Sequence, residues 1–238
     1  MLTLDRGDRA ATVAREVAEP VVVALVVAGI GRFVTGSNGL GARLLPGVTP
    51  EVAWSVERAV NSWLVARRRR GSDRVTWALS TYADTAPTMG AALAYGVVLQ
   101  VRRVAPGSIP SGLQPIAAAA LETVVFMSAA ALVGRARPDV IWLDRPAPTS
   151  SFPSGHTAAS TAVHRTVARL AWGRWRPGEG ARVSLARAGV AYGIPAAVGF
   201  SRVYRGMHHP SDVIVGWALG AWAAHTVARW DGSASAPC

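Results

Sequence analysis

The chain has 238 residues, half of them hydrophobic, and a formal net charge of +11 to which only arginine contributes, because none of its 25 basic residues is lysine. Its length fits a single domain, residues 1–238, and its one cysteine, Cys238, excludes an internal disulfide or a cysteine-based metal site. So basic a chain needs anionic partners. No nucleic-acid-binding module is recognisable, so we favour anionic lipid headgroups and a phosphorylated substrate over nucleic acid.

Runs of apolar residues about as long as a bilayer is thick predict an all-α integral membrane protein. We expect a bundle of six transmembrane helices, near residues 20–34, 87–101, 113–133, 157–172, 185–200 and 213–227. Several runs are shorter than the roughly 20 residues that a membrane-crossing helix needs, so their flanks must extend them. The fourth run is the weakest, because His164, Arg165 and Arg169 interrupt it. The first has no A-x-A-like cleavage site and is interpreted as a retained anchor.

Residues 50–66, between the first two runs, have an amphipathic pattern. Val56, Val60 and Trp63 recur at helical spacing, opposite Glu57 and Arg58. The pattern predicts an amphipathic helix in the membrane interface. The four arginines at residues 67–70, which follow it, suit the edge of an anionic membrane surface.

The positions of the basic loops orient the predicted bundle, because cytoplasmic loops are enriched in basic residues. Two loops would be cytoplasmic by this rule, and they contain Arg102, Arg103, Arg174, Arg176 and Arg182. Residues 135–153 and 201–212 then face the outside of the cell (plasma) membrane. The arginines at residues 67–70 also fall outside, against the rule.

The outer loops carry three polar clusters, which read Arg135-Ala-Arg137-Pro138-Asp139, then Phe152-Pro153-Ser154-Gly155-His156, then Ser201-Arg202 followed by His208 and Asp212. Phosphoryl transfer needs a nucleophile, a group that protonates the leaving oxygen, and fixed positive charge for the equatorial oxygens. Each cluster taken singly also has a structural explanation, such as a loop histidine or an ordinary helix start. Together, on one face of a membrane bundle, they indicate phosphoryl-transfer chemistry.

The spacing of these clusters resembles the three-part signature of the type 2 phosphatidic acid phosphatase (PAP2) family. The matching parts are Arg137-Pro138, then Pro153-Ser154-Gly155-His156, then Ser201-Arg202-x5-His208-x3-Asp212. The likeness covers residues 130–212, and the six-span layout extends it to nearly the whole chain. It implies a membrane lipid phosphatase that works through a phosphohistidine intermediate.

The resemblance and the chemistry together assign a role to each residue. His208 attacks phosphorus, while Asp212 accepts a hydrogen bond from its other ring nitrogen. His156 protonates the leaving group and later takes a proton from water. The phosphate oxygens are expected to bind the backbone at the start of the fourth helix and two guanidinium groups, at Ser154, Gly155, Arg137 and Arg202. No metal or other cofactor is required.

One position departs from the family pattern. The family has a lysine seven residues before the arginine of Arg-Pro, and here that position is Ala130. Arg135 is the hypothetical substitute for this phosphate ligand. If it does not reach the site, the alternatives are Arg145, Arg205 or the arginines at residues 67–70.

Two carboxylates outside the signature have open roles. Glu122 lies within the third run, where an ion pair with Arg165 or Arg187 is the favoured interpretation over a functional one. Asp84 precedes the second run, and either lines the substrate entrance or caps a helix.

The substrate is less specified than the reaction. Polyprenyl pyrophosphate is favoured, and phosphatidate, phosphatidylglycerol phosphate and a polyprenyl-phosphosugar phosphate are the alternatives. From a different class, a lipid-binding or lipid-transporting protein would keep the phosphate cradle with little turnover. Vanadate-dependent halide oxidation uses a similar constellation, but in soluble proteins.

Overall fold

The structure, a computed structural model, describes residues 6–35, 50–102, 111–173, 178 and 180–230. Within these ranges the chain is helical, without a strand. The main helices are α1 (Arg6–Val34), α3 (Pro50–Ala66), α4 (Arg70–Tyr82), α5 (Thr85–Arg102), α6 (Gln114–Val133), α7 (Gly155–Trp172), α8 (Ala181–Ala188), α9 (Ile194–Tyr204) and α10 (Pro210–Trp230). Helices therefore occupy all six predicted positions. Cys238, Arg103, Arg174 and Arg176 lie outside the described residues.

Three of the described helices are long and apolar enough to cross a membrane, at Arg15–Val34, Gln114–Val133 and Ala181–Tyr204. The last is α8 and α9 joined without a break by one π-helical turn, Gly189–Gly193. A shorter apolar stretch lies in α5, at Ala86–Val98. These helices support the predicted membrane protein, while the number of spans is not fixed by length and composition alone.

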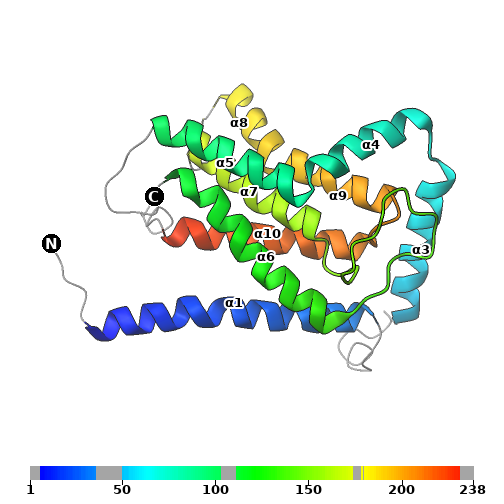
Figure 1. Cartoon of the computed structure of the whole chain (residues 1–238), viewed down its shortest axis with the longest axis horizontal. Helices are drawn as coiled ribbons and strands as arrows, with labels where there is room; N and C mark the ends of the chain where they lie inside the picture. Colours follow the sequence, from blue (N-terminus) through cyan, green and yellow to red (C-terminus); the bar gives the residue numbers. More distant parts are fainter. Residues whose placement is uncertain (1–5, 36–49, 103–110, 174–177, 179, 231–238) are drawn as a thin grey trace.

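The centre of the bundle is α7, which packs against α5, α6, α9 and α10 (Figure 1). This position explains the polar residues that interrupt its apolar run. His164 is buried and contacts the hydroxyl of Tyr82 at 2.7 Å, and the guanidinium of Arg165 lies 4.9 Å from the ring centre of Tyr192. A helix enclosed by other helices can carry polar groups, because its neighbours satisfy them away from lipid.

Glycines bring α10 close to α7. A Cβ atom on Gly216 would lie 2.5 Å from the carbonyl oxygen of Ser154, and one on Gly220 would lie 2.2 Å from that of Ala158. Any side chain at either position would have to push the two backbones apart. Small residues at helix interfaces permit this approach in membrane bundles.

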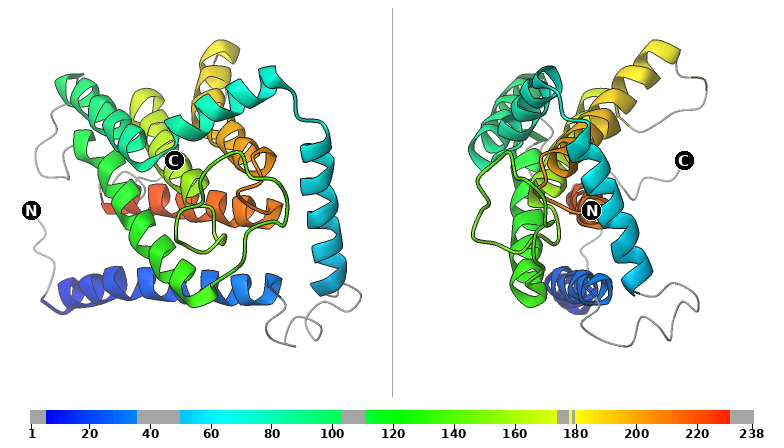
Figure 2. Two further views of the ribbon diagram at one scale, coloured as in Figure 1. Left: turned by 45° about the vertical axis from the view of Figure 1, so that its right-hand side comes forward. Right: turned by 90° about the vertical axis from the view of Figure 1, so that its right-hand side faces the viewer.

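Figures 1 and 2 show α3 standing across one end of the bundle, roughly perpendicular to α1. Its bounds agree with the predicted amphipathic segment, and its polar residues divide between the surface, where Arg58 is exposed, and the bundle. Glu57 and Asn61 are buried against the bundle, whereas Val56 and Trp63 are more than half exposed. The amphipathic pattern found the helix, and partners in the bundle satisfy part of its polar side, while its place in a membrane interface stays a prediction.

The sequence did not predict α4, which begins at Arg70, the last of the four arginines. Arg68 donates to the carbonyl oxygens of Tyr204 and Ile141, at 2.7 Å each, so it anchors the turn after α9. Arg67 lies over the ring of Trp63, 4.2 Å from its centre. At least these two arginines therefore make defined contacts within the protein.

Candidate active site

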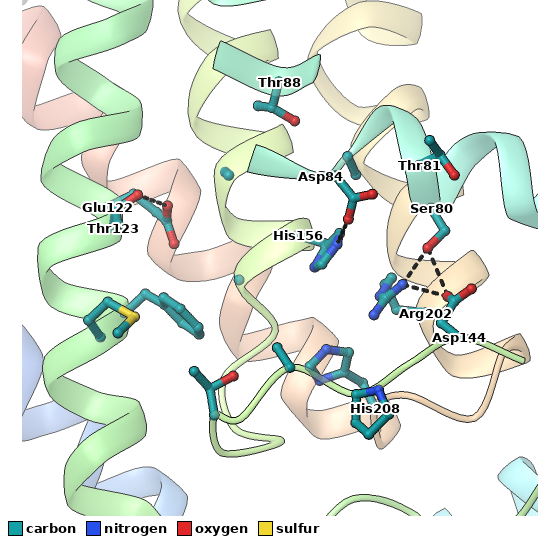
Figure 3. A pocket seen from close by; sticks show the side chains of 18 of the residues that line it. Ser80, Thr81, Asp84, Thr88, Glu122, Thr123, Asp144, His156, Arg202 and His208 are labelled. Atoms are coloured by element: carbon teal, nitrogen blue, oxygen red, sulfur yellow. Dashed lines mark hydrogen bonds and ion pairs between the residues drawn. The ribbon is translucent and has the colours of Figure 1, made fainter. Parts of the chain in front are cut away.

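A cavity of about 580 Å³ opens at the end of the bundle near α3 and α4, and residues of all three sequence clusters line it. Arg137 comes from the loop after α6, His156 from the start of α7, Arg202 from α9, and His208 from the turn before α10. Figure 3 shows the side chains of His156, Arg202 and His208 directed toward the same space. The fold thus gathers groups that are up to 71 residues apart in the chain (137 to 208).

His208 is buried, and its Nδ1 lies 2.6 Å from the carbonyl oxygen of Ser151. A carbonyl oxygen only accepts, so Nδ1 carries the proton and Nε2 keeps its lone pair. Asp212 was expected to accept this hydrogen bond, but its Oδ2 is 3.7 Å from Nδ1, too far for one. The backbone of the loop before α7 fixes the tautomer instead, and Asp212 acts on the ring as a nearby charge.

Burial lowers the pKa of His208 below its ordinary value of 6.5, since a charged imidazole is disfavoured away from water. The carboxylate of Asp212 opposes this effect, and the charges of Arg202 and Arg137 reinforce it. The net lowering keeps His208 neutral near pH 7, which is the state that a nucleophile requires.

Asp212 lies in the first turn of α10, which begins at Pro210 as expected for a proline that starts a helix. Its Oδ2 accepts from the hydroxyl of Ser151 at 2.6 Å and from the backbone N–H of His209 at 2.8 Å. Its Oδ1 pairs with the guanidinium of Arg135. The carboxylate therefore holds together the loop before α7 and the turn that contains His208.

His156 has a carboxylate partner that the sequence left undecided. Its Nε2 lies 2.8 Å from Oδ1 of Asp84, in the turn between α4 and α5. Asp84 lines the cavity, and its carboxylate is engaged by His156, while only its backbone carbonyl accepts an N–H of α5, from Thr88. The predicted topology puts residue 84 on the same outer side of the membrane as the three clusters. This placement was the feature of the sequence that could have indicated the contact between Asp84 and His156.

Arg202 is held by Asp144, a residue that the sequence analysis did not single out. Its NH1 lies 2.9 Å from Oδ2 of Asp144 and also bonds Ser80, while Arg205 contacts both oxygens of Asp144, at 2.7 and 2.8 Å. Burial alone would raise the pKa of Asp144, but Arg205 and Arg202 hold it below its ordinary range. Within the described residues Nε of Arg202 is buried and has no hydrogen-bond partner.

Two expected phosphate ligands are turned elsewhere. Arg135 does not line the cavity, because its guanidinium lies between Glu57, at 2.5 Å, and Asp212. Ser154 is also buried outside the cavity, and its backbone N–H already donates to the carbonyl of Asp212 at 3.0 Å. Arg137 and Gly155 do line the cavity as expected.

The position of the missing family lysine, Ala130, is buried in α6. The cavity contains one further arginine, Arg145, which is exposed and forms no ion pair within the described residues. Arg145 is therefore available to bind phosphate in the role that was expected of Arg135.

Glu122 is fully buried in the wall of the same cavity. Figure 3 shows it on α6, on the opposite side of the space from His156. The favoured ion pair is absent from the described structure, where Arg165 stacks on Tyr192 and Arg187 bonds the carbonyl of Trp172. Oε1 of Glu122 has no hydrogen-bond partner there.

No group of three or more His, Cys, Asp or Glu side chains suited to a metal ion occurs among the described residues. The lining instead combines two histidines, arginines and the start of a helix. Side chains of these types can bind an anion and can serve as a nucleophile and a proton donor.

The fold and the cavity define a helical membrane protein with a basic, two-histidine site at one end of its bundle. The chain belongs to the PAP2 superfamily, whose family model matches residues 112–235, just over half of its length. No curated protein sequence matches it significantly.

Two solved structures resemble the fold. The first transmembrane PAP2-type phosphatidylglycerolphosphate phosphatase, from Bacillus subtilis, superimposes with a TM-score of 0.67 at 19% identity, covering 92% of this chain and 96% of its own. LpxE from Aquifex aeolicus gives 0.54 at 20% identity, covering 74% of this chain and 94% of its own. The first likeness extends the shared fold to nearly the whole chain, well beyond the segment that the family model matches.

Proposed function

We propose that this protein is a membrane lipid phosphatase that removes phosphate from a phosphate or pyrophosphate monoester through a phosphohistidine at His208. One observation carries the proposal. The hydrogen bond from Nδ1 of His208 to the carbonyl of Ser151 leaves a lone pair on Nε2, in a cavity that also contains His156, Arg137 and Arg202. Membership in the PAP2 superfamily agrees with this chemistry.

In the first step Nε2 of His208 attacks phosphorus and the bond from phosphorus to the leaving oxygen breaks. His156 donates a proton to that oxygen. Burial and the charge of Arg202 lower the pKa of His156 to about 4, and the hydrogen bond to Asp84 opposes this lowering. The negative charge of the bound phosphate must therefore help to protonate the ring. Negative charge on the other phosphate oxygens is met by Arg137, by Arg202 and by the N-terminal end of α7.

In the second step water attacks the phosphohistidine and the phosphorus–nitrogen bond breaks. His156, now neutral, takes a proton from the water, and inorganic phosphate leaves. His208 returns to its starting tautomer because Nδ1 stays bonded to Ser151 throughout. One histidine thus serves as acid and then as base.

Arg145 is proposed as the third phosphate cation, in place of the family lysine that Ala130 replaces. It is exposed at the cavity and lacks the carboxylate partners that occupy Arg135. Three guanidinium groups suit an anion with more charge than a simple monophosphate. This agrees with polyprenyl pyrophosphate as the favoured substrate.

Phosphatidate, phosphatidylglycerol phosphate and a polyprenyl-phosphosugar phosphate are the other candidate substrates. The Bacillus subtilis protein that shares the fold is a phosphatidylglycerolphosphate phosphatase, so phosphatidylglycerol phosphate stays among the candidate substrates. All share an anionic head on a lipid tail, so the same cradle serves each.

We further propose that all six long helical segments cross the plasma membrane, with anionic lipids around them, and that α3 lies near the outer surface. The cavity then faces outward. The half-exposed Val56 and Trp63 of α3 would contact lipid at that surface.

A lipid-binding or lipid-transporting protein is the rival of another class. Binding requires the arginines, but it does not require a proton donor with its own carboxylate. The contact between His156 and Asp84 therefore favours turnover over binding.

The test is a phosphate-release screen of the four lipids with the purified full chain in detergent. We expect release from at least one, fastest from the pyrophosphate, and an acid-labile phosphoenzyme on rapid mixing with labelled substrate. Tight binding of these lipids without phosphate release would favour lipid transport and contradict the proposal.

A further inference from the structure

Behind the nucleophile, a buried chain of polar contacts leads to α3. Glu57 accepts the backbone N–H of Ser211 at 3.0 Å through Oε1, and it binds Arg135 at 2.5 Å through Oε2. Arg135 in turn contacts the hydroxyl of Ser211 at 2.8 Å and the carboxylate of Asp212. The contacts therefore run from α3 through the loop after α6 to the first turn of α10.

A second contact from α3 reaches the nucleophile itself. Asn61, one helical turn after Glu57, donates from Nδ2 to the backbone carbonyl of His208 at 3.1 Å. Residues spaced by four lie on one face of a helix, so Glu57 and Asn61 approach the turn before α10 side by side. The two contacts hold that turn at His208 and at Ser211.

The network is closed to water. The side chains of Glu57 and Arg135 are 10% and 5% exposed, and that of Asp212 is fully buried. One buried guanidinium shared by two carboxylates is costly unless every group is paired, and removal of one partner leaves an uncompensated charge. Such an arrangement fixes geometry more than it adds stability.

We propose that α3 is part of the catalytic apparatus, with Glu57, Asn61 and Arg135 as positioning residues that fix the place and the electrostatic surroundings of His208. The proposal rests on the function proposed above, because it takes His208 as the nucleophile. None of the three residues touches the cavity. Arg135 thus has a role in the site, though not as a phosphate ligand.

The alternating charges of Glu57, Arg135 and Asp212 predict opposite effects on the protonation of His208 when one charge is removed. Glu57, Arg135 and Asp212 together carry a net charge of −1 next to His208. Arg135→Gln makes this −2, which favours protonated His208, whereas Glu57→Gln makes it zero and disfavours the protonated form. Arg137, Arg202 and His156, which also act on His208, are unchanged in both variants. The neighbouring His209 responds to Glu57, Arg135 and Asp212 as well, so its signal is assigned separately by its loss in His209→Gln.

The experiment follows the protonation of His208 directly in the full chain in detergent. Protein labelled with ¹⁵N-histidine is titrated by NMR, and the His208 signal is assigned by its loss in His208→Gln. We expect the midpoint to rise in Arg135→Gln and to fall in Glu57→Gln, with the wild-type value regained in Arg135→Lys. This readout needs no turnover, so it stays informative even if the proposed reaction is wrong.

Kinetics with farnesyl pyrophosphate, a water-soluble lipid pyrophosphate, provide the second arm. Asn61→Leu and Glu57→Gln should lower kcat by roughly 10- to 100-fold with little change in KM, because small displacements of a reacting group are that costly. Arg58→Gln, on the exposed side of α3, is the matched control and should behave as wild type.

The outcomes separate the two proposals. Midpoints that move in the same direction, or not at all, in Arg135→Gln and Glu57→Gln would overturn the role of α3. Opposite midpoint shifts in a protein that releases no phosphate from any lipid tested would support the network and reject the phosphatase. Unchanged kcat in both Asn61→Leu and Glu57→Gln would also contradict the positioning role.

Discussion

The imidazole of His156 is paired with the carboxylate of Asp84, whose Oδ1 lies 2.8 Å from Nε2 across the junction of α4 and α5. A carboxylate only accepts in this contact, so Nε2 of His156 carries a proton. The pair orients the ring, and it opposes the lowering of the His156 pKa to about 4 that burial and the charge of Arg202 cause.

We therefore expect Asp84→Asn to lower kcat by roughly 10- to 100-fold, within the usual contribution of general acid–base catalysis. Loss of the carboxylate disfavours protonated His156, so the alkaline limb of the pH profile should move to lower pH. Measurement of kcat against pH checks this, with Asp84→Glu as the charge-preserving control. An unchanged profile would reduce Asp84 to a structural contact.

His208→Ala and His156→Ala should each abolish turnover, whereas His209→Ala should retain most of it. The first two side chains line the cavity, and that of His209 does not. Phosphate release from purified variants is the measurement. With a pyrophosphate substrate His156→Ala should also accumulate phosphoenzyme, because its hydrolysis lacks a base. Near-wild-type release from either of the first two variants would reject the mechanism.

The acid limb of kcat/KM for the wild-type protein should lie below pH 6.5. A free histidine becomes largely protonated below its pKa, but burial lowers the pKa of His208 from its ordinary 6.5, so its neutral nucleophilic form persists to lower pH. A pH profile with a soluble lipid phosphate checks the sign. An acid limb well above 6.5 would mean that Asp212 outweighs burial.

Arg145→Gln should lose about 3 kcal/mol of transition-state stabilisation, the usual cost of removing one charged or hydrogen-bonding oxyanion donor. The effect should appear more in kcat than in KM. Introducing Ala130→Lys into that variant restores the family cation and should recover part of the activity if the two side chains reach the same phosphate. Equal catalytic efficiency in Arg145→Gln and wild type would mean that Arg145 does not bind the phosphate, and that Arg137 and Arg202 are its arginine ligands.

Glu122→Leu should raise the thermal unfolding temperature measured in detergent. The carboxylate is fully buried and one of its oxygens lacks a partner within the described residues, and such a group costs about 1–3 kcal/mol. Activity should be retained if Glu122 is only part of the cavity wall. Lower kcat/KM with an unchanged unfolding temperature would instead identify a contact with the substrate.

The sequence predicted the helices well because bilayer-length apolar runs and helical spacing are local signals. The segment at residues 50–66 was bounded correctly by such a pattern, and the family signature brought His156, Arg202 and His208 to one site. Local patterns do not identify partners across the fold, however. Nothing near residue 57 in the chain indicates that Glu57 pairs with Arg135, so the polar side of α3 was assigned to the membrane interface.

The same limit explains the errors at the site. Arg135 and Arg145 are both arginines in one outer loop, and only the fold decides which of them has carboxylate partners. The carbonyl of Ser151, which fixes the tautomer of His208, carries no side-chain signal at all. Asp84 had a usable signal, because the predicted topology puts it on the same side of the membrane as the three clusters.

The close approach of α10 to α7 affects how the protein tolerates its surroundings. Gly216 lies one turn after Asp212 and faces the carbonyl of Ser154, which is two residues before His156. The backbones of α10 and α7 are therefore in contact close to His208 and His156. Two helices in backbone contact cannot move closer together, and glycine leaves no side chain between them to repack. We therefore expect the spacing of the two histidines to change less than that of the other helices when bilayer thickness changes.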